Sequence, residues 1–118
     1  MNRTITLATL DHGTVTVPEP GWCTGHADHR PCHLVDLTHT GSEHRFAFDG
    51  DDLLVAMFSQ HPHATQQRTG VLVEQTGWAR TLDYAGLRQL AAALTVHAMH
   101  LRTLADQLAA IQAEEGGK

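Results

Sequence analysis

The chain has 118 residues, 42% of them hydrophobic and 18% charged, which suits one domain with a single core. Its formal net charge is −5 and its one lysine is Lys118, which argues against a protein that binds nucleic acid by neutralising phosphates. Two cysteines are too few for a disulfide scaffold, and no apolar run approaches the roughly 20 residues of a membrane span. With no signal peptide at the start, we expect a cytoplasmic protein. The ten histidines are the unusual feature.

The N-terminal segment has the pattern of a β-hairpin. Residues 4–8 and 13–17 alternate apolar side chains with threonine, and Asp11, His12 and Gly13 suit the turn between them. Pro18 and Pro20 are expected to end the second strand, because proline cannot donate to a sheet ladder.

A second hairpin is predicted from residues 33–39 and 44–48, joined by a turn at 40–43. In this register His39 and His44 would lie nearly opposite each other on the buried face, although a slip of one residue would separate them. Further strands are expected at 53–59, 70–75 and 77–82, which gives a sheet region over residues 3–82.

A long helix is expected at the C-terminus, over residues 84–114, with Asp83 as its N-cap. Along one face of this helix, residues recur at alternating spacings of three and four, as in a coiled coil, and all but one are apolar. This seam consists of Leu87, Leu90, Leu94, His97, Leu101, Leu104, Leu108 and Ile111. The helix would be about 45 Å long, whereas short strands span only about 20 Å. We therefore expect its C-terminal half to pack against a second copy in a homodimer.

These elements predict an α+β protein, with a small antiparallel β-sheet followed by one long C-terminal α-helix in a single domain over residues 1–118.

The loop over residues 21–31 has no periodicity and carries the clearest chemical signal. Cys23 and His26 have the Cys-x-x-His spacing of a metal knuckle, in which Gly25 allows the tight turn. Zinc in such sites takes three protein donors and water, or four protein donors. The remaining donors could come from the same region or from the following hairpin, namely His29, Cys32, His33, His39 and His44.

Other interpretations of these residues remain open. The histidines could be partly buried side chains bonded to backbone carbonyls. Cys32, which follows Pro31, could begin a strand as a small apolar residue. A nucleophilic Cys23 with His26 or His39 as its base would need an orienting third group, which the sequence does not reveal.

The order of these features resembles an uncharacterised family of small actinobacterial proteins with a Trp-Cys…His…His-x-Gly signature and an Ala/Leu-rich C-terminal helix. The matching residues extend from Val15 to about Ile111, and the signature corresponds to Trp22-Cys23, His26 and His39-Thr40-Gly41. The resemblance implies Cys23, His26 and His39 as the ligand set, and it does not extend to Cys32, His29 or His44. It implies no reaction.

From these observations we expect a non-enzymatic regulatory or adaptor protein that binds one zinc ion through Cys23, His26, His39 and a fourth ligand, with Cys32 as the candidate. The alternative is a metalloenzyme or metal sensor, in which water would occupy the fourth position. A nucleic-acid regulator would need the seven arginines on one face, and they are scattered along the chain.

Overall fold

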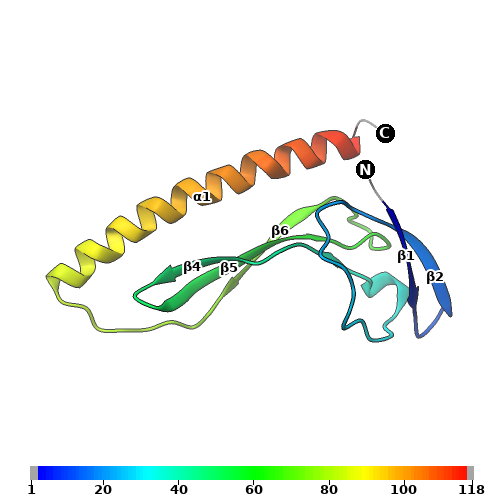
Figure 1. The fold of residues 1–118 in the computed structure, drawn as a ribbon, viewed down its shortest axis with the longest axis horizontal. Helices are drawn as coiled ribbons and strands as arrows, with labels where there is room; N and C mark the ends of the chain where they lie inside the picture. Colours follow the sequence, from blue (N-terminus) through cyan, green and yellow to red (C-terminus); the bar gives the residue numbers. More distant parts are fainter. Residues whose placement is uncertain (1–2, 117–118) are drawn as a thin grey trace. The chain divides into compact units, whose positions relative to one another are not determined.

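The computed structural model describes residues 3–116 and confirms the predicted α+β class (Figure 1). Antiparallel β-strands precede one long C-terminal helix. In chain order the elements are β1 (Arg3–Ala8), β2 (Thr14–Glu19), the 3-10 helix η1 (Leu34–Asp36), β3 (His39–Thr40), β4 (His44–Phe48), β5 (Asp51–Gln60), β6 (Gly70–Gln75) and α1 (Tyr84–Gly116). No helix within residues 3–116 combines the length and hydrophobicity needed to cross a membrane.

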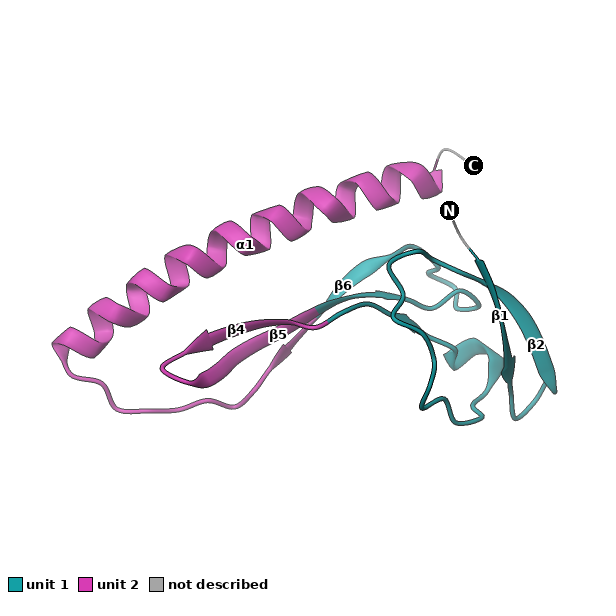
Figure 2. Ribbon diagram, viewed as in Figure 1, with its two compact units in different colours: residues 1–42, 57–72 teal, residues 43–56, 73–118 magenta. Residues whose placement is uncertain are grey.

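Contacts divide the chain into two compact units, which are coloured separately in Figure 2. Unit 1 comprises residues 1–42 and 57–72, and unit 2 comprises residues 43–56 and 73–118. The expected single domain over 1–118 stays a prediction.

In unit 1, β1 and β2 form the expected antiparallel hairpin, with Leu7 and Val17 on its buried face. The expectation that Pro18 ends the second strand is wrong, because Pro18 lies inside β2 opposite Thr4. In this two-stranded sheet β2 pairs with β1 alone, so the missing N–H of Pro18 can fall on the unpaired edge.

The predicted hairpin between residues 33–39 and 44–48 is also wrong. Residues 34–36 form η1, and Leu37 packs with the Leu7 and Val17 side chains while Leu34 packs at the edge of the cluster. Burying apolar side chains three residues apart requires a helical turn, since alternate residues of a strand point to opposite faces. The backbone N–H of Leu34 also donates to Oδ1 of Asp11, at 2.9 Å.

β5 organises the remaining strands. β3 and β4 both pair antiparallel with it, and β6 also pairs with it. The Cα partner of His39 is Gln60, whereas that of His44 is Ala56. The two histidines therefore do not face each other, as the predicted hairpin had required.

In unit 2, the expected final strand at 77–82 is absent, since residues 76–83 have no regular secondary structure. Side chains hold this segment instead. Thr76 Oγ1 donates to the Asp52 carbonyl at 2.7 Å, and Arg80 pairs with Asp49 at 2.6 Å and with Asp51. Backbone pairing is not needed to fix a segment that is tied in this way.

The helix α1 begins as predicted and continues two residues beyond the predicted end. Oδ1 of Asp83 accepts a hydrogen bond from the backbone N–H of Gly86 at 2.8 Å, which confirms Asp83 as the N-cap. Against β4, His97 Nε2 donates to the Ala47 carbonyl at 2.7 Å, and the His97 ring meets Phe46 edge-on. An imidazole thus provides a specific contact between helix and strand.

Candidate metal centre

Two segments of unit 1, the loop after β2 and the strand β3, bring Cys23, His26 and His39 together. Cys23 lies just after β2, where its N–H bonds the Pro20 carbonyl at 3.0 Å and closes a turn. His26 follows three residues later, beyond Gly25, whose φ of 102° strongly favours glycine. His39 begins β3.

The loop is attached to β3 through its backbone. The N–H of Thr24 donates to the Thr40 carbonyl at 3.1 Å, and the Thr24 hydroxyl reaches the same oxygen at 3.2 Å. These bonds join the residue after Cys23 to the residue after His39, so they fix the register between the two ligating segments.

The donor atoms of the three residues converge. His26 Nε2 lies 3.6 Å from Cys23 Sγ and 3.2 Å from His39 Nδ1, and all three atoms lie within 4.8 Å of one another. Cys23 and His39 are 4% and 1% exposed, while His26 is half-buried. The site is thus a buried Cys/His/His group that could hold a metal ion.

Hydrogen bonding alone does not satisfy this arrangement well. One imidazole nitrogen carries either one proton or one lone pair, yet His26 Nε2 contacts both Cys23 and His39. It can make a good hydrogen bond to one of them only. Three donor atoms around one point are instead well satisfied by a cation, which accepts a lone pair from each.

Electrostatics favour the neutral forms of Cys23 and His39 in the absence of metal. Burial, followed by the neighbouring His26, lowers the pKa of His39, so its ring stays in the form that binds metals. Burial raises the pKa of the Cys23 thiol, and the Glu19 carboxylate adds to that effect, although the backbone amides of Gly25 and Thr40 oppose it. Metal binding would therefore have to release the thiol proton.

A close contact explains the glycine after His39 and Thr40. Gly41 is buried, and a Cβ atom there would lie 3.3 Å from the Trp22 carbonyl oxygen and 3.4 Å from Cβ of Phe58. The Gly41 N–H donates to the Phe58 carbonyl at 2.9 Å, and the Trp22 and Phe58 rings lie 6.0 Å apart. The Trp-Cys and His-x-Gly segments thus pack directly on each other.

Cys32, the expected fourth ligand, is not part of this group. It packs against the hydrophobic cluster of Leu7, Val17 and Leu37, and its carbonyl accepts the N–H of Leu10 at 2.8 Å. Its surroundings are those of a small apolar residue.

The other three candidates for the fourth position also make different contacts. His29 Nε2 donates to the Ala8 carbonyl at 2.9 Å, and His33 Nδ1 lies 3.7 Å from an Asp11 carboxylate oxygen. The His44 ring packs against His100, with ring centroids 5.2 Å apart. Among the residues described, the metal-binding group contains none of these histidines.

Sequence reasoning missed Glu19, which is 2% exposed. Nη2 of Arg3 lies 3.2 Å from Glu19 Oε1 and 3.4 Å from the Cys23 carbonyl oxygen, so one guanidinium nitrogen joins the carboxylate to the Cys23 backbone. Burial alone would raise the pKa of Glu19, but hydrogen bonds from Arg3 and Cys23 outweigh it and the pKa is lowered. The alternation of Val15, Val17 and Glu19 was the available signal, hidden by the expectation that Pro18 ends the strand.

Comparison with known proteins identifies the family. The model of a domain of unknown function, DUF6907, matches residues 4–110. The chain belongs to this family. Neither the search of curated proteins nor that of solved structures gives a match. The DUF6907 match supports the expectation of an uncharacterised family and names no activity, so function has to be argued from the site.

The Gly41 contact gives a direct test of the site's framework. Gly41→Val should lower the free energy of unfolding by about 2 kcal/mol, because the added methyl groups would displace the Trp22 backbone beside Cys23. Thermal and urea unfolding followed by circular dichroism would measure this loss. Ser42→Val changes the adjacent exposed residue and should be nearly neutral. Equal stability of the two variants would contradict the proposed packing.

Proposed function

We propose that this protein binds one zinc ion per chain through Cys23, His26 and His39. The convergence of three donor atoms on one point, with His26 Nε2 shared between two partners, is the observation that carries the proposal. A thiolate with two neutral imidazoles is a donor set that suits zinc, whereas magnesium and calcium prefer oxygen ligands.

We assign the ion a structural role in a non-enzymatic regulatory or adaptor protein. The ligands come from a loop without regular structure and from a strand of two residues, neither of which has much secondary structure of its own. A metal joining them would stabilise unit 1 by constraining this loop. The burial of Cys23 and His39 supports this assignment, because it limits the access of a substrate to the ion.

The second candidate function is a metalloenzyme or metal sensor. Its support is the number of ligands: three protein donors converge, and the fourth-ligand candidates from the sequence make contacts elsewhere. Three protein ligands with water in the fourth position is the usual arrangement of catalytic zinc.

We also propose that α1 mediates homodimerisation. Leu104 is its only buried residue in the described part of the chain, and Leu87, at the N-terminal end of the seam, is 56% exposed. A second copy is the occupant we propose for the seam residues outside the contact between His97 and β4, since each copy supplies the same leucine pattern.

The remaining sequence-based assignments are consistent with this proposal. We propose that the Trp-Cys…His…His-x-Gly pattern is the metal-binding signature of the family, because the structure packs Trp22 on Gly41 beside the ligands. A cytoplasmic location would keep Cys23 reduced and available to zinc. The scarcity of lysine suits an actinobacterial source.

Metal content provides the primary test. Protein purified without chelators should contain about one equivalent of zinc by elemental analysis. Cys23→Ser or His39→Ala should release it and lower the melting temperature by more than about 10 °C, since structural zinc contributes folding free energy.

His29→Ala is the matched control, because it removes a neighbouring histidine that contacts the Ala8 carbonyl instead. This variant should keep its zinc. Wild-type protein with less than about a tenth of an equivalent would refute the metal site altogether.

Cobalt substitution distinguishes the two functions. If the ion is structural, a fourth protein ligand must complete its coordination, and the visible absorption spectrum of the Co(II) protein should then not change when azide is added. A shift of the d–d bands with azide would show an open coordination position and favour the enzyme or sensor.

Light scattering tests the dimer. The wild type should have about twice the chain mass of 12.9 kDa, and Leu87→Asp with Leu108→Asp should reduce it to the monomer by placing charges in the seam. Ala92→Asp with Thr103→Asp places the same charges on exposed residues of the opposite face and should leave the mass unchanged. A monomeric wild type would exclude this dimer.

A further inference from the structure

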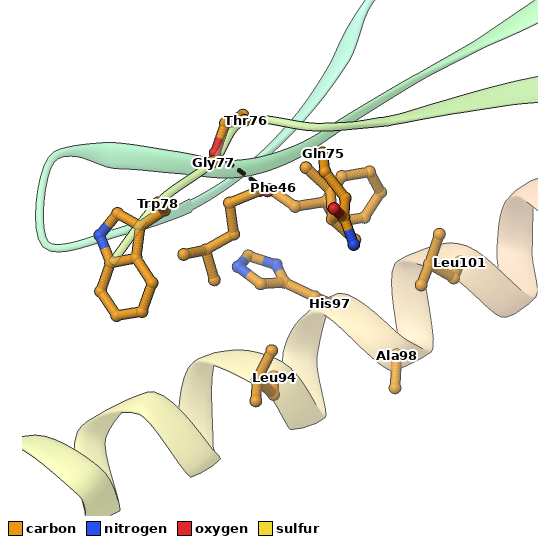
Figure 3. A pocket seen from close by; sticks show the side chains of 11 residues that line it. Phe46, Gln75, Thr76, Gly77, Trp78, Leu94, His97, Ala98 and Leu101 are labelled. Carbon is orange, nitrogen blue, oxygen red and sulfur yellow. Dashed lines mark hydrogen bonds between the residues drawn. The ribbon is translucent and has the colours of Figure 1, made fainter. Parts of the chain in front are cut away.

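Unit 2 contains a cavity of about 340 Å³ that the zinc site does not involve (Figure 3). Leu94, Ala98 and Leu101 of α1 line one side, and Phe46 of β4 and Trp78 line the other. No charged side chain is among its lining residues. The cavity is therefore suited to an uncharged, mainly apolar molecule.

One contact of His97 shows which of its two ring nitrogens can accept a hydrogen bond. It also lines the cavity, and its Nε2 lies 2.7 Å from the Ala47 carbonyl oxygen. A carbonyl only accepts hydrogen bonds, so Nε2 must carry the proton. In the neutral ring Nδ1 then holds a lone pair that can accept a hydrogen bond.

Two contacts hold the ring in position. The bond to Ala47 fixes one edge of the imidazole, and Phe46 meets the ring nearly perpendicularly, at 83° with centroids 5.4 Å apart. Figure 3 shows the ring extending from α1 toward the strands. The Nδ1 acceptor is thus preorganised rather than free to rotate.

Two other polar side chains around the cavity, those of Thr76 and Gln75, contribute less. The Thr76 hydroxyl already bonds the carbonyls of Asp52 and Leu53, at 2.7 and 3.2 Å. Gln75 is exposed at the end of β6. Nε1 of Trp78, which also lines the cavity, is buried without a hydrogen-bond partner among the described residues and can donate to a bound molecule. His97 and Trp78 are therefore the two groups best placed to orient a bound molecule.

The volume of the cavity limits the size of a bound molecule. A cavity of about 150 Å³ lined by apolar side chains can hold benzene, so about 340 Å³ has room for a two-ring compound. The aromatic walls formed by Phe46 and Trp78 favour a flat ring system, which can stack on them or meet them edge-on.

We propose that this cavity is a binding site for an uncharged aromatic molecule of about ten to fifteen non-hydrogen atoms that carries one hydroxyl or N–H group. The hydroxyl or N–H donates to Nδ1 of His97, and the rings lie between α1 and the strands. The site is independent of zinc binding, since its residues belong to unit 2 and the metal ligands to unit 1.

The probe is 2-naphthol, with naphthalene as the matched compound that lacks the donor. Titration of ¹⁵N-labelled protein should shift the amide signals of the lining residues, with a dissociation constant of about 0.1 mM for 2-naphthol. Naphthalene should bind about tenfold more weakly, because it leaves Nδ1 of His97 unpaired.

Two variants locate the site. Ala98→Phe fills the cavity and should abolish the shifts, whereas Ala91→Phe places the same ring at an exposed position of α1 and should preserve them. His97→Phe should remove the preference for 2-naphthol over naphthalene.

The absence of shifts in the wild type at 1 mM 2-naphthol, about ten times the expected constant, would overturn the proposal. Shifts confined to residues outside the cavity would also overturn it. These two outcomes depend on the wild type alone, so they hold even if Ala98→Phe or His97→Phe fails to fold. Zinc content is measured separately, so failure of this site would leave the metal proposal intact.

Discussion

The ten-residue strand β5 is the constraint on which the arrangement of the histidines depends. It pairs with β3 at one stretch and with β4 at another, so its length lets two short segments share one partner strand. This register places His39 at Gln60 and His44 at Ala56. As a result, His39 joins the loop that carries Cys23, while His44 packs with His100 of α1.

The metal centre follows from this placement. β3 contributes only two residues, yet its Thr40 carbonyl holds Thr24 of the loop and its His39 ring reaches His26. Burial favours the neutral forms of Cys23 and His39, so a bound cation would add the charge and the directional bonds that the group lacks. The same burial makes a nucleophilic Cys23 less favourable, although His39 supplies the third group that such a mechanism needs.

Histidine has a different use in unit 2. His97 occupies a seam position of α1, where a leucine would contribute more buried apolar area. Its bond to the Ala47 carbonyl instead specifies how the helix meets β4, and it leaves an oriented acceptor beside an apolar cavity. One residue type thus provides candidate metal donors in one unit and a packing contact in the other.

The sequence by itself determined the α+β class, the first hairpin, the N-cap at Asp83 and the Cys-x-x-His knuckle, because alternation, capping and turn chemistry act over a few residues. The resemblance selected His39 from among the candidate donors. Tertiary structure decided that residues 34–36 form the 3-10 helix η1 rather than a strand. It also decided that Cys32 packs against a hydrophobic cluster and that Glu19 is buried near Cys23. Those outcomes depend on strand partners distant in the chain, and local patterns do not encode which partner a segment finds.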